Sequence, residues 1–176
     1  RRVKSGKVRG GVRGGAWFSD PGVEGGAENW RAGLAGRGLG DLCERAWVPV
    51  GGETGIHFFG STSMSEPDCR VPRQIPSTRE ITAGDVVFCE ISGAFRGYSG
   101  QVLRSFTVEA DPSPLYRDLY DTATAAYDAI CDVLAPGVHM QDVVAASAVI
   151  EQAGFTTCDD LMHGYGGGYL DRKSTV

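Results

Sequence analysis

The sequence contains no apolar run that approaches the ~20 residues of a membrane helix. Arg1 and Arg2 open it, but no apolar segment of the kind that a secretory leader needs follows them. The five cysteines are odd in number and widely spaced, and no C-x-x-C pair occurs. This pattern argues against a disulfide framework and a zinc knuckle. Together these absences predict a soluble protein with no membrane contact and with reduced thiols, in a cytoplasmic compartment.

Positive charge is also scarce. The sequence contains 17 Lys and Arg and 22 Asp and Glu, which gives a net charge of −5. The chain as a whole is therefore not expected to bind nucleic acid. Basic residues gather before Asp20, and two R-G-G triplets lie within residues 9–15. Such segments bind RNA through charge and a flexible backbone. An RNA-associated protein is one alternative function, and a flexible N-terminus is the plainer interpretation of the same residues.

Glycine is concentrated at the start of the chain, where 12 of the 26 glycines fall between Gly6 and Gly40. Glycine at this density destabilises both helices and strands. Residues 1–45 are therefore predicted to be a mostly irregular Gly/Arg-rich segment, with at most a short helix at 28–34 or 41–46. Residues 46–176 are predicted to hold the domain.

Regular elements are clearest in the second half of the chain. Two β-rich runs around a glycine-containing turn predict an antiparallel hairpin of residues 86–91 and 98–108. Two helices are predicted to follow, at 113–135 and 140–153, before a glycine-rich turn at His163. Upstream, 47–50 reads as a short strand and 61–78 as a long proline-containing loop. This order predicts an α+β fold, a curved antiparallel sheet with helices packed on one face.

Four segments in this order resemble one family: residues 81–90, residues 96–106, Ala135-Pro136-Gly137 and His163-Gly164-Tyr165-Gly166. They resemble the pita-bread hydrolases, which include aminopeptidase P, Xaa-Pro dipeptidase, methionine aminopeptidase and creatinase. The resemblance implies that 46–176 is a partial pita-bread domain, truncated at its C-terminal end. It also implies a hydrolase of peptide or amide C–N bonds with a small peptide or amide substrate, and a homodimer.

The resemblance gives Glu90 and His163 the catalytic role, and Gln101, His57 and Arg104 the role of lining residues or vestigial ligands. Glu90 and Gln101 are eleven residues apart, so a turn centred on residues 95–96 would place them directly opposite each other across the hairpin. Both catalytic assignments have a plainer alternative. Glu90 is also explained as a solvent-facing carboxylate at a strand end without a role in a site. His163 is also explained as a histidine that caps backbone carbonyls in a turn.

The family's two-metal members carry Asp where this chain has Glu90 and Gln101. A neutral amide offsets no cationic charge. The sequence therefore predicts at most one divalent metal (manganese, cobalt, zinc or iron), held by Glu90 and His163, or none. The family's substrate-side histidine is replaced by Arg73, and two downstream glutamates are not present. The expectation is an incomplete or weakly active hydrolase, with a catalytically silent binding or assembly module as the alternative.

Overall fold

The computed structural model describes residues 31–69, 71–75, 77–158, 161–165 and 172–175. Contacts divide the chain into two compact units, Arg1–Asp111 with Tyr165–Arg172 and Pro112–Gly164 with Lys173–Val176. The R-G-G segment at 9–15 lies outside the described residues. None of the described helices is long and apolar enough to cross a membrane.

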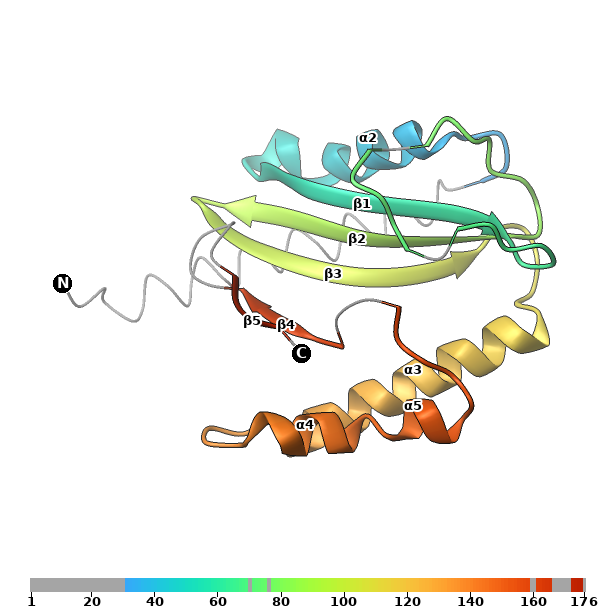
Figure 1. Cartoon of the computed structure of the whole chain (residues 1–176). Coiled ribbons are helices and arrows are strands. Elements are labelled where there is room, and N and C mark those ends of the chain that lie inside the picture. Colours follow the sequence, from blue (N-terminus) through green and yellow to red (C-terminus); the bar gives the residue numbers. More distant parts are fainter. Residues whose placement is uncertain (1–30, 70, 76, 159–160, 166–171, 176) are drawn as a thin grey trace. The chain divides into compact units, whose positions relative to one another are not determined.

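The first unit is built on a three-stranded antiparallel sheet of order β1-β2-β3, shown in Figure 1. Its strands are β1 (Glu53–Ser63), β2 (Asp85–Phe95) and β3 (Tyr98–Thr107). The predicted hairpin is thus confirmed. The predicted turn centre was wrong, however, because the turn lies at Arg96-Gly97, with φ of 52° and 76°. A two-residue turn with both φ values positive matches the twist of the strands, and glycine adopts such a φ readily.

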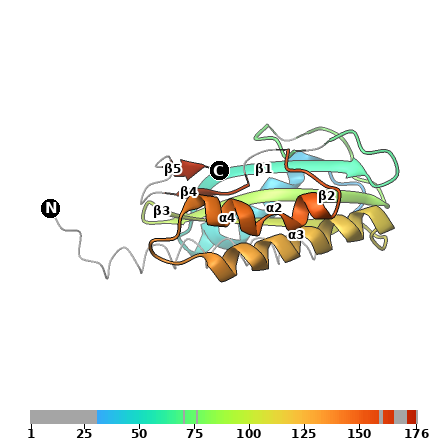
Figure 2. The ribbon, with the colours of Figure 1, turned by 60° about the horizontal axis from the view of Figure 1, so that its bottom comes forward.

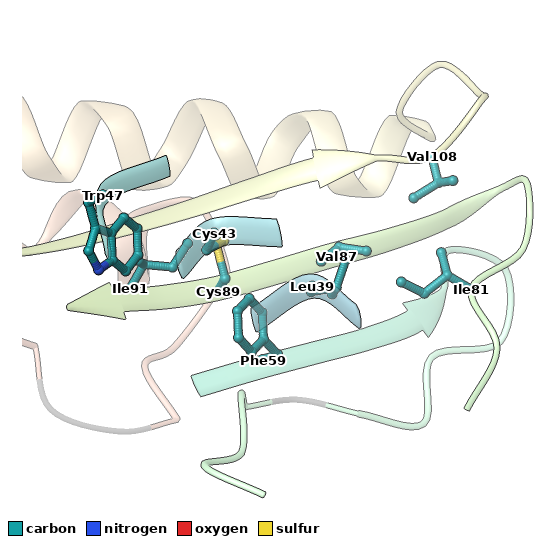
Figure 3. Close-up of a cluster of buried hydrophobic side chains, with 9 residues drawn as sticks. All are labelled: Leu39, Cys43, Trp47, Phe59, Ile81, Val87, Cys89, Ile91 and Val108. Carbon is teal, nitrogen blue, oxygen red and sulfur yellow. The ribbon is translucent and has the colours of Figure 1, made fainter. Parts of the chain in front are cut away.

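Helix α2 (Gly36–Trp47) covers one face of this sheet (Figure 1). Leu39, Cys43 and Trp47 recur every fourth residue, on one stripe of the helix, and all three are fully buried. Figure 3 shows them packed against the sheet residues of the core. This helix crosses residue 45, where the predicted domain was expected to begin. Burial of the stripe outweighs the low helix propensity of the glycines.

Two local predictions between α2 and β2 also need correction. Residues Val48–Val50, predicted as the end of a short strand, form the 3₁₀-helix η1 around Pro49. The predicted loop of 61–78 begins too early, because Ser61–Ser63 are the last residues of strand β1, which was not predicted. The loop that follows β1 does return to its edge, where Phe59 and Arg73 exchange both backbone hydrogen bonds at 3.0 and 2.9 Å.

Among its described residues, the second unit contains three helices, with α4 and α5 lying along α3 (Figure 2). Helix α3 (Pro114–Val133) begins at the predicted cap, where the Ser113 hydroxyl accepts from the Tyr116 N–H at 3.4 Å. The helix predicted over 140–153 is instead two, α4 (Met140–Ala146) and α5 (Val149–Gln152). The Ser147 hydroxyl donates to the Val144 carbonyl at 2.8 Å at this break, a bond that competes with helix continuation. Strands β4 (His163–Tyr165) and β5 (Arg172–Thr175) pair with each other.

Candidate functional site

The two faces of the sheet carry different chemistry. Glu90 in β2 lies directly opposite Phe58 in β1 and Leu103 in β3, and Ser92 lies opposite Gln101. Directly opposed residues share a face, and neighbours along a strand point to opposite faces. Glu90 therefore lies on the face that α2 does not cover, which is called the Glu90 face below.

Glu90 and Gln101 contact each other across the hairpin. The observed register offsets them by two residues, so they meet diagonally rather than directly, and they stay on one face because the offset is even. The Gln101 Nε2 donates to Glu90 Oε1 and, at 3.1 Å, to the hydroxyl of Ser92, which is only 2% exposed. A carboxamide nitrogen carries two N–H donors. Both are used here, which fixes the amide with its nitrogen against the carboxylate.

This arrangement does not fit a two-metal centre. A glutamine could ligate a metal only through its carbonyl oxygen, whereas Gln101 turns its nitrogen toward Glu90. Two divalent ions 3.5–4 Å apart need several carboxylates to offset their charge. Across the described parts of the chain, no three His, Cys, Asp or Glu side chains gather where they could hold a metal ion.

The structure places His57 on the other face of the sheet, against α2. Its Nδ1 accepts from the Ser92 N–H at 3.4 Å, and its ring lies edge-on to Trp47 at 5.6 Å between centroids. Its Nε2 lies 3.3 Å from Glu44 Oε1, within ion-pair distance but without hydrogen-bond alignment. Burial lowers the pKa of His57, although Glu44 acts in the opposite direction. His57 is therefore a neutral core residue that links β1 to α2.

Two further predicted site residues are not brought to Glu90. Arg104 lies opposite Cys89 on β2, so the register assigns it to the α2 face, and its Nη1 donates to the Leu103 carbonyl at 2.8 Å. His163 begins β4 in the second unit, and its proximity to Glu90 stays a prediction.

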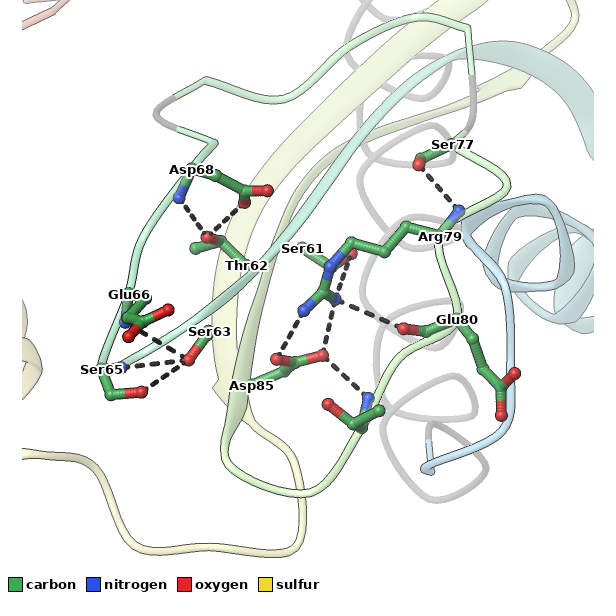
Figure 4. A network of polar contacts seen from close by, with 11 residues as sticks. Ser61, Thr62, Ser63, Ser65, Glu66, Asp68, Ser77, Arg79, Glu80 and Asp85 are labelled. Atoms are coloured by element: carbon green, nitrogen blue, oxygen red, sulfur yellow. Dashed lines mark hydrogen bonds and ion pairs between the residues drawn. The ribbon is translucent and has the colours of Figure 1, made fainter.

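An ion pair that the sequence did not reveal fixes the start of β2 (Figure 4). Asp85 is 1% exposed and accepts two hydrogen bonds from Arg79, at 2.6 and 2.8 Å, and one from the Thr82 N–H at 2.8 Å. Arg79 also donates to the hydroxyl of Ser61 in β1 at 3.3 Å. Burial alone would raise the pKa of Asp85, but Arg79 and Thr82 outweigh it, and the pKa is lowered. Beside this network, Arg73 and Arg79 line a cavity of about 130 Å³.

The model of metallopeptidase family M24 matches residues 24–172. The chain belongs to metallopeptidase family M24. A methionine aminopeptidase of Staphylococcus epidermidis is 30% identical over 112 residues, which cover 62% of this chain and 44% of that protein. Prolidase from Pyrococcus furiosus has a TM-score of 0.82 at 18% identity, over 99% of this chain and 54% of its own. X-Pro aminopeptidase from Thermotoga maritima has a TM-score of 0.80 at 16% identity, over 99% and 49%.

These comparisons confirm the predicted α+β pita-bread fold and the predicted family. The M24 chain spans about half the length of the relatives it matches. The register adds two site residues that the sequence did not single out, Phe58 and Ser92. The sequence could have indicated Ser92, because it lies two residues after Glu90 on a strand and therefore shares its face.

Proposed function

We propose that this M24 chain is part of a hydrolase of C–N bonds that acts on a short peptide or a small amide. The observation that carries the proposal is Glu90, a half-buried carboxylate on the hairpin face, at the position where the family resemblance places a functional acid. The family membership supports the reaction class, and the resemblance supports the substrate class.

The chemistry follows from the contacts of Glu90. Attack of water on an amide carbon needs a group that accepts the water's proton and a donor that stabilises the developing oxyanion. Glu90 is the proton acceptor in this proposal, and Gln101 with Ser92 holds its carboxylate in one orientation. His163 is proposed as the second polar group of the reaction. Because the hairpin does not fit a two-metal centre, no step is assigned to a metal.

The second candidate is a binding or assembly module without catalysis. It is supported by the same contact, since an amide that donates to Glu90 takes the place of a second acid and competes for the lone pairs that a base would use. The two candidates differ in whether turnover depends on Glu90.

The test is hydrolysis of Xaa-Pro and Met-Xaa dipeptides and of a small amide by the full 176-residue chain. Each assay is run with manganese, cobalt, zinc or a chelator, for wild type, Glu90→Gln and the control Glu66→Gln. Glu66 is exposed in the loop after β1, so its substitution removes the same charge elsewhere. The proposal predicts turnover that Glu90→Gln lowers at least tenfold and Glu66→Gln leaves unchanged. Absence of turnover under all conditions would reject the hydrolase in favour of the silent module.

A further inference from the structure

We propose that a cavity at the outer edge of β1 binds a small zwitterion, a molecule that carries one anionic and one cationic group. The cavity has a volume of about 130 Å³, and its charged lining residues are Asp68, Arg73 and Arg79. A volume of this size holds several water molecules or one small organic molecule. Binding of a zwitterion here is independent of the proposed hydrolase reaction.

The cavity is separate from the candidate site at Glu90. Phe59 and Ser61 line it from β1, and Arg73 lies directly opposite Phe59. Directly opposed residues share a face, so these three side chains belong to the α2 side of the sheet. Phe58, which lies opposite Glu90, belongs to the Glu90 face. A ligand in the cavity therefore occupies a different place from a substrate at Glu90.

Two side chains of opposite charge line the cavity without an ionic partner. Within the described parts of the chain, neither Asp68 nor Arg73 forms an ion pair. Their charged groups are therefore too far apart for direct contact, although both line one cavity. A zwitterion supplies an ammonium group for Asp68 and a carboxylate for Arg73, so each charge meets its opposite. A simple anion would be repelled by Asp68, and a simple cation by Arg73.

Both charged residues are anchored to β1. The Asp68 Oδ1 accepts from the Thr62 hydroxyl at 2.8 Å, and the Asp68 N–H donates to the same hydroxyl at 2.7 Å (Figure 4). Oδ2 remains for a ligand. Arg73 is held through its backbone, which exchanges hydrogen bonds of 3.0 and 2.9 Å with Phe59. Anchoring of this kind lowers the entropy that a ligand must remove when it binds.

Arg79 and Ser61 add hydrogen-bond donors to the wall of the cavity. Asp85 balances the charge of Arg79, but a guanidinium carries five N–H donors. Printed acceptors use Nη1 and one N–H of Nη2, so Nε and the other N–H of Nη2 have no acceptor among the described residues. Ser61 is 8% exposed and accepts from Arg79, which leaves its O–H to donate. These donors suit the carboxylate end of a zwitterion.

The experiment is a ligand-observed NMR titration of the full chain with glycine and β-alanine, whose charges are separated by different distances. Acetate and methylammonium are the ligands of single charge. We expect one zwitterion to bind roughly threefold or more tightly than either of them, a modest factor because the partner charges are exposed. Asp68→Asn, which keeps an oxygen for Thr62, and Arg73→Gln should each remove this preference. The controls Glu66→Gln and Arg37→Gln change exposed charges elsewhere and should keep it.

Alkylation of Cys69 locates the binding within the chain. Cys69 lines the cavity and is half-buried, whereas Cys131 is an exposed thiol in the second unit. The preferred zwitterion should slow the reaction of Cys69 with iodoacetamide, measured by peptide mass spectrometry, and leave Cys131 unchanged.

Equal binding of zwitterions and singly charged ligands would overturn the inference. A preference that survives both Asp68→Asn and Arg73→Gln, or binding that does not protect Cys69, would do the same. If either variant does not fold, as judged by circular dichroism, the protection of Cys69 in wild type decides.

Discussion

Replacing Asp85 by Asn tests the ion pair that fixes the start of β2. The substitution keeps the size of the side chain and removes the charge that faces Arg79 across hydrogen bonds of 2.6 and 2.8 Å. Breaking a buried ion pair by removing one partner costs about 3–5 kcal/mol. We expect about 3 kcal/mol, the low end of that range, because the Arg79 side chain is 31% exposed and can regain contact with water.

The direction in which the effect of Asp85→Asn changes with pH follows from the lowered pKa of Asp85. The pKa of Asp85 is lowered in the folded chain, so its contribution is present above the unfolded pKa of 3.8 and is lost as the pH falls through the folded value. The difference between wild type and Asp85→Asn should therefore be full at pH 7 and should shrink below pH 3.8. The assay is urea unfolding followed by circular dichroism at several pH values.

Asp41→Asn is the matched control, because Asp41 pairs with Arg45 at 2.6 Å on the exposed surface of α2. An exposed pair one helical turn apart contributes only about 0.3–0.5 kcal/mol. If Asp85→Asn costs no more than Asp41→Asn at pH 7, the argument from burial is refuted.

Two further predictions concern the first unit. The pKa of His57 is lowered by burial despite Glu44, so the folded state disfavours its protonation, and wild-type stability should fall as the pH drops below 6.5. His57→Gln should flatten this part of the pH profile in urea unfolding, and an unchanged profile would contradict the neutral core histidine. Gly60→Ala should destabilise by about 1–3 kcal/mol, because its β-carbon would overlap the Phe88 ring. Gly38→Ala, which meets only ordinary contacts inside α2, should instead stabilise by up to about 1 kcal/mol, and equal effects would refute the overlap.

The hairpin could be predicted from sequence because β-branched and aromatic residues flank a turn that contains glycine. Its register could not, since it depends on which two residues adopt positive φ, and Arg96-Gly97 do so. The pairing of Glu90 with Gln101 survived this error because the register moved by two residues. Helix α2 was predicted only as a possible short helix at 41–46, for a different reason. Its glycines have a low helix propensity, and the prediction was based on that propensity. The helix is stabilised by the burial of Leu39 and Trp47 against the sheet, a tertiary effect that propensity does not include.

The site was harder to predict than the fold, because strand parity decides which side chains meet. His57 lies next to Phe58, the residue opposite Glu90, and for that reason points to the other face. The Arg79–Asp85 pair joins a loop residue to a strand end. Nothing in their spacing distinguishes this pair from two solvated charges, so only the burial of Asp85 reveals it.

The most direct test of the central claim is the metal content of the full chain. Wild type and the double variant Glu90→Asp/Gln101→Asp are dialysed against manganese, cobalt or zinc, and bound metal is measured by elemental analysis. A hairpin face that offers one carboxylate, Glu90, and the neutral amide of Gln101 predicts at most one equivalent for wild type and tighter binding by the double variant. Two equivalents in wild type, together with hydrolysis of an Xaa-Pro dipeptide, would contradict the claim.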